Sequence, residues 1–362
     1  MIYRTPEIAP KLQRRLDTLA ALRAELGHEV ERPVRWIGSL RRDVRASTIG
    51  SSTSIEGYGV APGEAVSLLS GKTSLDPADE NRMAVACYAR AMDHVGTMAA
   101  DPAFRWLDRV ILDLHFDACY FQGDKDPGLW RTGPVGVSAP DGSLEYEGPD
   151  SDRVPGLMSE VVDWLEHGDV GADPVVRAAM AHLQVTSVHP FRDGNGRVSR
   201  IVQSLVLARA GMTSAEFFSI EDYLGAHTAD YYSALREVQG GSYQPERDAS
   251  KWVAFCVEAH VDQAQRRIAQ FRQAGARWER LERLVEERGW PDRLVIALER
   301  SLMGGTGRTE YGEEADVAAV TASGDFRRLL DAGLVVQRGR GRSTRYEASE
   351  SLRTDVAEAA RR

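Results

Sequence analysis

Apolar residues recur at helical spacing over most of the chain. From Lys11 to Leu26, leucines fall near one face of a helix, which we expect Gly27 to end. The same periodicity predicts helices over residues 34–45, 79–98, 106–121, 157–167, 173–188, from about 195 onward, 229–239 and 249–287. A Ser/Thr/Gly-rich segment, 47–59, should interrupt the pattern after residue 45, and the helix 249–287 should break near Gly275.

Two regions favour short strands instead. Residues 123–149 are rich in Gly, Pro and Asp, and Val135 and Val137 alternate ahead of the pair Asp141-Gly142, which predicts a β-hairpin. After Gly289-Trp290-Pro291, short helices are expected at 292–302, 313–319 and 321–332, with a Gly-rich connector at 304–312 and two strands around a basic turn at 334–346. This order is that of a winged helix, so we expect a mostly α fold with a small C-terminal winged-helix domain.

Composition sets limits on this picture without naming a function. The chain has 362 residues, which suggests two domains and a small third, and its 43% hydrophobic and 27% charged residues are typical of soluble globular proteins. A net charge of −9 argues against coating nucleic acid or an anionic membrane along the whole length. Three widely spaced cysteines fit neither a disulfide framework nor a zinc site. Without a signal-peptide core or a long apolar run, we expect a cytoplasmic protein with no membrane partner.

Candidate chemistry concentrates in residues 189–200, which read HPFRDGNGRVSR and lie between two strongly periodic helices. Gly194 and Gly196 let the backbone approach a ligand closely, so successive amides can form an anion-binding nest at the start of the next helix. Arg197 and Arg200 add charged donors from the first turn of that helix. These features of the segment predict a phosphate-binding site.

Two further residues extend this interpretation. Asp193 lies beside the expected anion, an arrangement that becomes favourable when a divalent cation such as Mg²⁺ lies between them. His189 is the residue of the segment that exchanges a proton near neutral pH. Each signal also has an ordinary reading as a tight turn, a capping histidine or a solvated arginine face. Their concentration in one short segment favours the phosphate site.

The segment resembles the signature of the Fic family, His-x-Phe-x-Asp/Glu-Gly-Asn-Gly-Arg-x-x-Arg, and matches it at every specified position. Segments 128–131, 181–185 and 231–235 are also similar to the family's core, so the resemblance covers roughly residues 84–267. It implies a Fic-type helical bundle with a β-hairpin flap, and transfer of AMP from ATP to a Ser, Thr or Tyr hydroxyl of a protein target, including the enzyme itself. The Doc branch, which phosphorylates its target, has Lys in place of Gly196, so the resemblance is to the adenylyltransferase type.

The resemblance also implies a role for each residue. His189 would be the general base, and Asp193 would hold Mg²⁺. The phosphates of ATP would lie in a cradle formed by Gly194, Asn195, Gly196 and Arg197, and Arg200 would contact the γ-phosphate. Phe191 would anchor the loop, and Trp130 and Arg131 would belong to the flap that docks the target.

A second motif lies far upstream. Ser52-Thr53-Ser54-Ile55-Glu56-Gly57 resembles the family's inhibitory motif, Ser/Thr-x-x-x-Glu-Gly/Asn, which implies that Ser52, Glu56 and Gly57 form a brake in which Glu56 pairs with Arg200. Without the resemblance, the same residues read as a Ser-capped helix that ends at Gly57.

The C-terminal region is locally basic only at its turn, where Arg338, Arg340, Arg342 and Arg345 lie close together in sequence. Its candidate recognition helix begins Thr321-Ala322-Ser323-Gly324-Asp325, which offers few side chains that read bases and one repelling charge. We favour protein docking or autoregulation over DNA binding, and leave DNA and a homodimer open as partners.

These observations define three expected regions: an inhibitory helical region at 1–83, a Fic core at 84–288 and a winged-helix-like domain at 289–362. Two other functions stay open at this point: a DNA-binding regulator whose core only senses nucleotide, and a Fic enzyme that mainly removes AMP.

Overall fold

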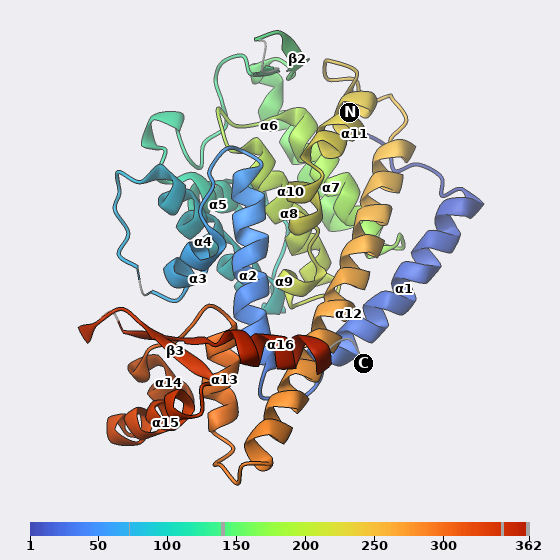
Figure 1. The fold of residues 1–362 in the computed structure, drawn as a ribbon. Helices are drawn as coiled ribbons and strands as arrows, with labels where there is room; N and C mark the ends of the chain where they lie inside the picture. Colours follow the sequence, from blue (N-terminus) through green and yellow to red (C-terminus); the bar gives the residue numbers. More distant parts are fainter. Residues whose placement is uncertain (72, 139–141, 342–343, 360–362) are drawn as a thin grey trace. The chain divides into compact units, whose positions relative to one another are not determined.

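The computed structural model describes residues 1–71, 73–138, 142–341 and 344–359. The chain forms two compact units: unit 1 comprises Met1–Pro33 and Ile37–Ile268, and unit 2 comprises Val34–Trp36 and the chain from Ala269 onward. The prediction of a mostly α fold is confirmed, because the described residues form helices and two small antiparallel hairpins (Figure 1). The three expected regions, 1–83, 84–288 and 289–362, stay a prediction.

Unit 1 contains most of the elements. Its helices and strands are α1 (Pro10–Glu31), α2 (Ile37–Ser54), α3 (Pro62–Leu69), α4 (Glu80–Ala100), α5 (Asp108–Cys119), β1 (Gly136–Ser138), β2 (Leu144–Glu147), α6 (Val154–His167), α7 (Pro174–Val188), α8 (Asn195–Arg209), α9 (Ala215–Phe218), α10 (Glu221–Ala226), α11 (Thr228–Gln239) and the first part of α12 (Ser250–Glu286). Short 3₁₀ turns lie at Gly123–Lys125 and Ser151–Arg153.

The centre of unit 1 is the helix pair α7 and α8. Asp173 caps α7 by accepting from the Val175 amide at 2.8 Å, and Pro174 occupies the first turn, where no amide hydrogen is needed. Both helices are buried on nearly all sides; α7 is mostly apolar, whereas α8 also buries polar and charged side chains, including Arg197 and Arg200. The loop that joins them is residues 189–194, so the candidate phosphate segment is attached to two of the most deeply buried helices of the unit.

The predicted hairpin is present in the described part of residues 123–149. Strands β1 and β2 pair antiparallel, with Val137 opposite Tyr146 and an irregularity between Val137 and Ser138. Of the predicted turn pair, Gly142 is described, at φ +84°, and Asp141 lies outside the described residues.

Unit 2 adds α13 (Leu294–Leu302), α14 (Arg308–Glu314), α15 (Ala319–Asp331), β3 (Val335–Arg338), β4 (Arg345–Ala348) and α16 (Glu350–Ala359) to the end of α12. Its core includes Phe326 stacked on Tyr346 with ring centres 3.9 Å apart. Asp325 is buried and accepts from Arg293 and from the Tyr311 hydroxyl. The repelling charge expected on the recognition helix is therefore inside the core. That unit 2 is a winged helix stays a prediction, and Arg342 lies outside the described residues.

Four helix predictions were wrong. Helix α1 continues past Gly27 to Glu31, α2 continues through the Ser/Thr/Gly-rich segment to Ser54, and α12 does not break at Gly275. The helix expected at 313–319 begins earlier, as α14 at Arg308. Within the described residues, no helix is both long enough and apolar enough to cross a membrane.

Candidate active site

The loop between α7 and α8 has a tightly specified backbone. His189 ends α7 in the left-handed region, at φ +50°, and its amide donates to the Val185 carbonyl at 3.0 Å. Gly194 precedes α8 at φ +75°, and a Cβ there would collide with Cys119 Sγ. Glycine is therefore required at Gly194 both for its backbone angles and for the space beneath it.

Asn195 closes the loop on itself. Its side-chain amide accepts from the Phe191 amide and donates to the Phe191 carbonyl, both at 2.9 Å. Phe191 is fully buried and stacks on His115 with ring centres 3.6 Å apart, so the expectation that it anchors the loop fits its position. The side chain of Asn195 fixes the shape of the loop, and its backbone amide lies at the start of α8; its expected part in the phosphate cradle stays a prediction.

His189 presents one ring nitrogen to the cavity. Its Nδ1 lies 3.1 Å from the Thr186 carbonyl, which can only accept, so Nδ1 carries the hydrogen and Nε2 is unprotonated. Burial lowers the pKa of His189 to about 4, which keeps the ring neutral at physiological pH. The ring lines a cavity of about 390 Å³ that is shared with Glu56, Asp193, Gly196 and Arg200 among others. This volume is in the range of small-molecule sites.

The flap is fastened to the loop by Arg131. Its backbone amide donates to the Pro190 carbonyl at 2.9 Å, and its guanidinium donates to the carbonyls of His189 and Gly133 at 2.8 and 2.7 Å. Arg131 is buried, while Trp130 packs against Phe191 with ring centres 5.1 Å apart. The two residues expected in the flap thus connect its base to the loop, and their part in docking a target stays a prediction.

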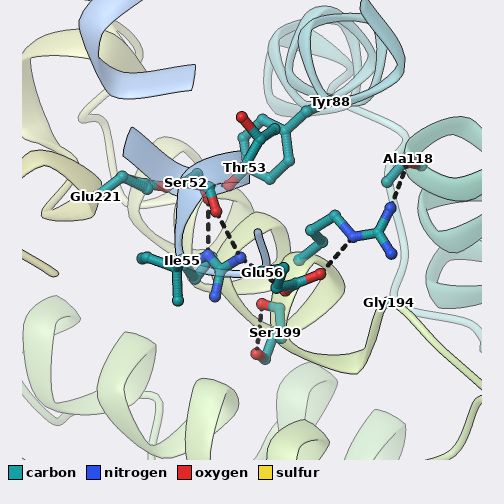
Figure 2. Close-up of polar contacts among 12 residues, drawn as sticks. Ser52, Thr53, Ile55, Glu56, Tyr88, Ala118, Gly194, Ser199 and Glu221 are labelled. Atoms are coloured by element: carbon teal, nitrogen blue, oxygen red, sulfur yellow. Dashed lines mark hydrogen bonds and ion pairs between the residues drawn. The ribbon is translucent and has the colours of Figure 1, made fainter. Parts of the chain in front are cut away.

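Glu56, labelled in Figure 2, forms ion pairs with two of the three arginines of α8, Arg197 and Arg200. Its Oε2 accepts from Arg197 Nε at 2.5 Å and its Oε1 accepts from Arg200 Nη2 at 2.8 Å. The exposed side-chain fraction is 0% for Arg197, 2% for Arg200 and 16% for Glu56. Burial is the largest single influence on the pKa of both arginines and lowers it, but the Glu56 carboxylate, the largest of the opposing influences, together with neighbouring acidic groups raises the pKa overall. Glu56 is therefore the anion that balances two buried charges.

Gly196 makes this approach feasible. A Cβ at Gly196 would lie 2.5 Å from Glu56 Oε1 and 3.2 Å from Arg200 Nη1. The carboxylate therefore occupies space directly against the first turn of α8, where backbone amides lack helical partners and the helix dipole favours negative charge.

Ser52 and Gly57 hold Glu56 in place. Ser52 is fully buried, and its hydroxyl and carbonyl oxygens accept from Arg200 at 2.7 and 3.0 Å. Gly57 closes α2 at φ +88°, and the amide of Tyr58 donates back to the Thr53 carbonyl at 3.1 Å. The alternative reading was half right: Gly57 does end a helix, but Ser52 lies inside that helix near its C-terminal end and is no N-cap.

Asp193 faces the cavity with a half-exposed side chain. Its Oδ1 accepts from the Gly194 amide at 2.7 Å, and its Oδ2 accepts from Gln122 Nε2 at 2.5 Å. The same Gln122 side chain accepts from Arg197 Nη2 at 2.8 Å.

The sequence did not point to three residues of this site: His115, Gln122 and Tyr58. His115 stacks on Phe191, and its Nδ1 accepts from the Gly128 amide at 2.8 Å, so Nε2 carries the hydrogen and donates to the Asp193 carbonyl at 3.0 Å. A histidine on the apolar face of the helix predicted at 106–121 was an available signal. Tyr58 and Gln122 carry no comparable signal, because their roles depend on segments far apart in the sequence.

Comparisons with known proteins agree with this geometry. Residues 106–207 match the family model described as the Fic/DOC family. The chain is 28% identical over 167 residues to protein adenylyltransferase fic-1 of Caenorhabditis elegans, a match that covers 42% of this chain and 30% of that protein. It is 28% identical over 275 residues to protein adenylyltransferase Fic of Drosophila willistoni, covering 72% of this chain and 49% of that protein. The chain thus spans less than half the length of these curated relatives.

Solved structures share the fold. A Fic family protein from Desulfovibrio desulfuricans G20 superposes with a TM-score of 0.62 at 21% identity, covering 96% of this chain and 99% of that one. Fic-1 (residues 134–508) from C. elegans gives a TM-score of 0.55 at 22% identity and covers 71% of each chain. The loop between α7 and α8, the fold around it and the matched sequence agree, and the chain therefore contains a Fic domain.

Proposed function

We propose that this protein is a protein adenylyltransferase, which transfers AMP from ATP to a Ser, Thr or Tyr hydroxyl of a protein target and is restrained by its own Glu56. One observation carries the proposal. The loop that matches the Fic signature at every specified position places His189, with Nε2 unprotonated, in a cavity that is also lined by Arg200 and by Glu56, the carboxylate that pairs with the buried Arg197. The relatives named protein adenylyltransferase support the same reaction.

The reaction that fits these groups is an in-line displacement. The target hydroxyl oxygen forms a bond to the α-phosphorus of ATP, the bond from that phosphorus to the oxygen bridging to the β-phosphate breaks, and pyrophosphate leaves. The hydroxyl proton passes to His189 Nε2, because Nδ1 already carries a hydrogen donated to the Thr186 carbonyl. A neutral imidazole with a pKa of about 4 is ready to accept that proton at pH 7.

The first turn of α8 would hold the phosphates. The amides of Asn195, Gly196 and Arg197 lack helical partners, and the positive end of the helix dipole lies at the same place. Arg197 and Arg200 would neutralise the phosphate oxygens once Glu56 has moved away. Residues that now balance one carboxylate would then bind the triphosphate.

The residues present also fit Mg²⁺. Mg²⁺ commonly binds through one or two carboxylates together with substrate phosphates and water. Asp193 supplies one half-exposed carboxylate at the cavity, and the described residues contain no cluster of three or more His, Cys, Asp or Glu that would hold a metal alone. When bound, the ion would neutralise charge on the phosphates, and Asp193 would hold it.

The brake follows from the same contacts. Glu56 Oε2 lies 2.5 Å from Arg197 Nε, and Glu56 Oε1 lies 2.8 Å from Arg200 Nη2. A phosphate cannot bind to these guanidinium nitrogens while the carboxylate is bonded to them. A like charge in the cradle also repels phosphate. Glu56 would therefore weaken ATP binding or hold ATP in an unreactive pose.

The test is self-modification with labelled ATP and Mg²⁺, followed by mass spectrometry. Glu56→Gly should gain the mass of AMP faster than the wild type, and Glu56→Gly combined with His189→Ala should gain none. Equal labelling of the wild type and Glu56→Gly would refute the brake, and labelling that survives His189→Ala would refute the general base. If the Glu56→Gly protein instead strips AMP from modified substrates without adding it, removal of AMP is the main reaction.

The partners follow from the proposal only in part. ATP and a protein with an accessible hydroxyl are required by the reaction. Docking of protein or DNA by unit 2, a homodimer and a cytoplasmic location stay predictions from the sequence.

A further inference from the structure

Gln122 joins groups that the proposed reaction uses separately. It lies three residues after the end of α5, and its backbone is hydrogen-bonded on both sides: its amide donates to the Cys119 carbonyl and its carbonyl accepts from the Lys125 amide, both at 2.9 Å. Its side chain contacts Asp193, Arg197 and Tyr58. A rigid backbone with three side-chain contacts makes Gln122 a fixed point of the site.

The orientation of the Gln122 amide is determined by its neighbours. Arg197 Nη2 can only donate, so the oxygen of the amide faces Arg197, at 2.8 Å. The carboxylate of Asp193 can only accept, so the nitrogen faces Asp193 Oδ2, at 2.5 Å. The second hydrogen of that nitrogen is donated to the Tyr58 hydroxyl, at 2.9 Å. All the polar atoms of the side chain are therefore engaged in one consistent arrangement.

A neutral amide is well suited to this position. An arginine or lysine bonded directly to Asp193 Oδ2 would cancel the charge that a cation needs, whereas an amide fixes the direction of the carboxylate and leaves its charge in place. Arg197 itself stays 3.7 Å from Asp193 Oδ1. Tyr58, two residues beyond Glu56, covers Arg197 with its ring, at 5.2 Å, and supports the amide with its hydroxyl.

We propose that Gln122 is a positioning residue: it aims the Asp193 carboxylate at the divalent cation that accompanies the nucleotide, and Tyr58 of the brake segment holds Gln122 in place. The inference rests on the proposed function, since it needs a nucleotide and its cation in this cavity. Gln122 acts through Asp193 and touches neither ligand.

The test is calorimetric binding of ADP, once with Mg²⁺ and once with EDTA, on the full chain carrying Glu56→Gly. The measured quantity is the ratio of the two affinities. Gln122→Met should lower this ratio by about 10-fold, as expected when a residue that orients a metal ligand is lost. Tyr58→Phe keeps the ring and removes only the hydroxyl, so it should lower the ratio by a smaller factor and serves if Gln122→Met does not fold.

Two comparisons separate this role from a structural one. Gln239 lines the other side of the cavity and donates to Ser187 Oγ at 3.1 Å, so Gln239→Met should leave the ratio unchanged. In an Asp193→Ala background, Gln122→Met should have no further effect on the ratio.

The inference is overturned if neither Gln122→Met nor Tyr58→Phe changes the ratio. It is also overturned if Gln122→Met lowers affinity equally in Mg²⁺ and EDTA, because Gln122 then serves only Arg197. A parent protein that binds no ADP under either condition would refute the proposed function and this inference together, which distinguishes that failure from the first two.

Discussion

Replacing Glu56 by Gln tests the central electrostatic feature of the site. Glutamine keeps the shape of the side chain and removes its charge, so Arg200 loses its paired carboxylate and Arg197 keeps only the more distant Asp193, 3.7 Å away. Removing one partner of a buried ion pair costs about 3–5 kcal/mol. Arg200 keeps its contacts with Ser52, and Arg197 keeps those with Ala118 and Gln122, which favours the lower end, about 3 kcal/mol.

This loss should be visible in thermal unfolding. At roughly 2–4 °C per kcal/mol for a unit of this size, Glu56→Gln should lower Tm by about 6–12 °C. Glu64→Gln is a matched control, because Glu64 also lies 2.7 Å from an arginine, Arg82, but with both side chains about one-third exposed. A solvent-exposed pair contributes little because water screens it, so this control should move Tm much less than Glu56→Gln does.

A nucleotide should reverse the loss in Glu56→Gln. ADP present at about 100 times its dissociation constant stabilises the folded state by about 2.7 kcal/mol, which would restore most of the lost Tm. The wild type should gain less from the same ADP concentration, because Glu56 competes for the arginines. Equal Tm values for the wild type and Glu56→Gln, with equal gains from ADP, would refute the assignment of Glu56 as the balancing anion.

Two more predictions concern the site and its surroundings. A Cβ at Gly196 would lie 2.5 Å from Glu56 Oε1, so Gly196→Ala in the Glu56→Gly background should place a methyl group where we expect phosphate to bind. The affinity for ADP, measured by calorimetry, should fall by at least about 10-fold. An unchanged affinity would contradict the prediction that phosphate takes the place of the Glu56 carboxylate. Burial lowers the pKa of four histidines in unit 1, to about 4 for His115 and His189 and to about 3 for His182 and His260. These histidines bind protons only in the unfolded state between pH 6.5 and about 4, so their stabilising contribution is complete above pH 6.5 and is lost as the pH falls, by up to about 1.4 kcal/mol per pH unit for each. Tm measured from pH 7 to 5 should fall accordingly, and His260→Gln should make that fall shallower; an unchanged slope would contradict the assignment.

Helix positions could be predicted where local pattern and tertiary packing agree. Helices α7 and α8 combine strong apolar periodicity, a capping Asp173 and a loop with the required glycine, so the bounds of α7 and the start of α8 followed from the sequence. Glycines misled where packing outweighed propensity. A Cβ on Gly275 would lie 3.6 Å from the Trp36 ring, an ordinary van der Waals distance, and α12 packs against this indole without a break at the glycine. Gly27 costs about 1 kcal/mol, which the buried leucines of α1 offset.

The second half of α2 was missed for a different reason. Ser and Thr disfavour helix interiors because their hydroxyls compete for nearby backbone groups. In α2 those of Ser47 and Ser51 instead donate to Asp222, at 2.9 and 2.7 Å, a residue far away in sequence. No local pattern contains this partner. The predicted interruption was therefore a helix stabilised by tertiary hydrogen bonds.

Some residues of the candidate site could likewise be predicted from the local sequence, and others could not. Residues 189–200 follow one another along the chain, so their chemistry could be interpreted together from the sequence. The contacts of Gln122 link positions 58, 122, 193 and 197, and only the fold brings these together.

The shortness of β1 has a consequence for how a target would be chosen. In the described part of the hairpin, strand β1 is Gly136–Ser138 and lies along the cavity, so on the proposed function an incoming segment could form only a few backbone hydrogen bonds with these residues. Such bonds contribute about 0.5–1.5 kcal/mol each, well below the roughly 4–15 kcal/mol that association costs in lost freedom of motion. Backbone hydrogen bonds also depend little on which side chains the target segment carries. The flap would then set the distance between a target hydroxyl and His189. The affinity that distinguishes one target from another must come from contacts with a second surface.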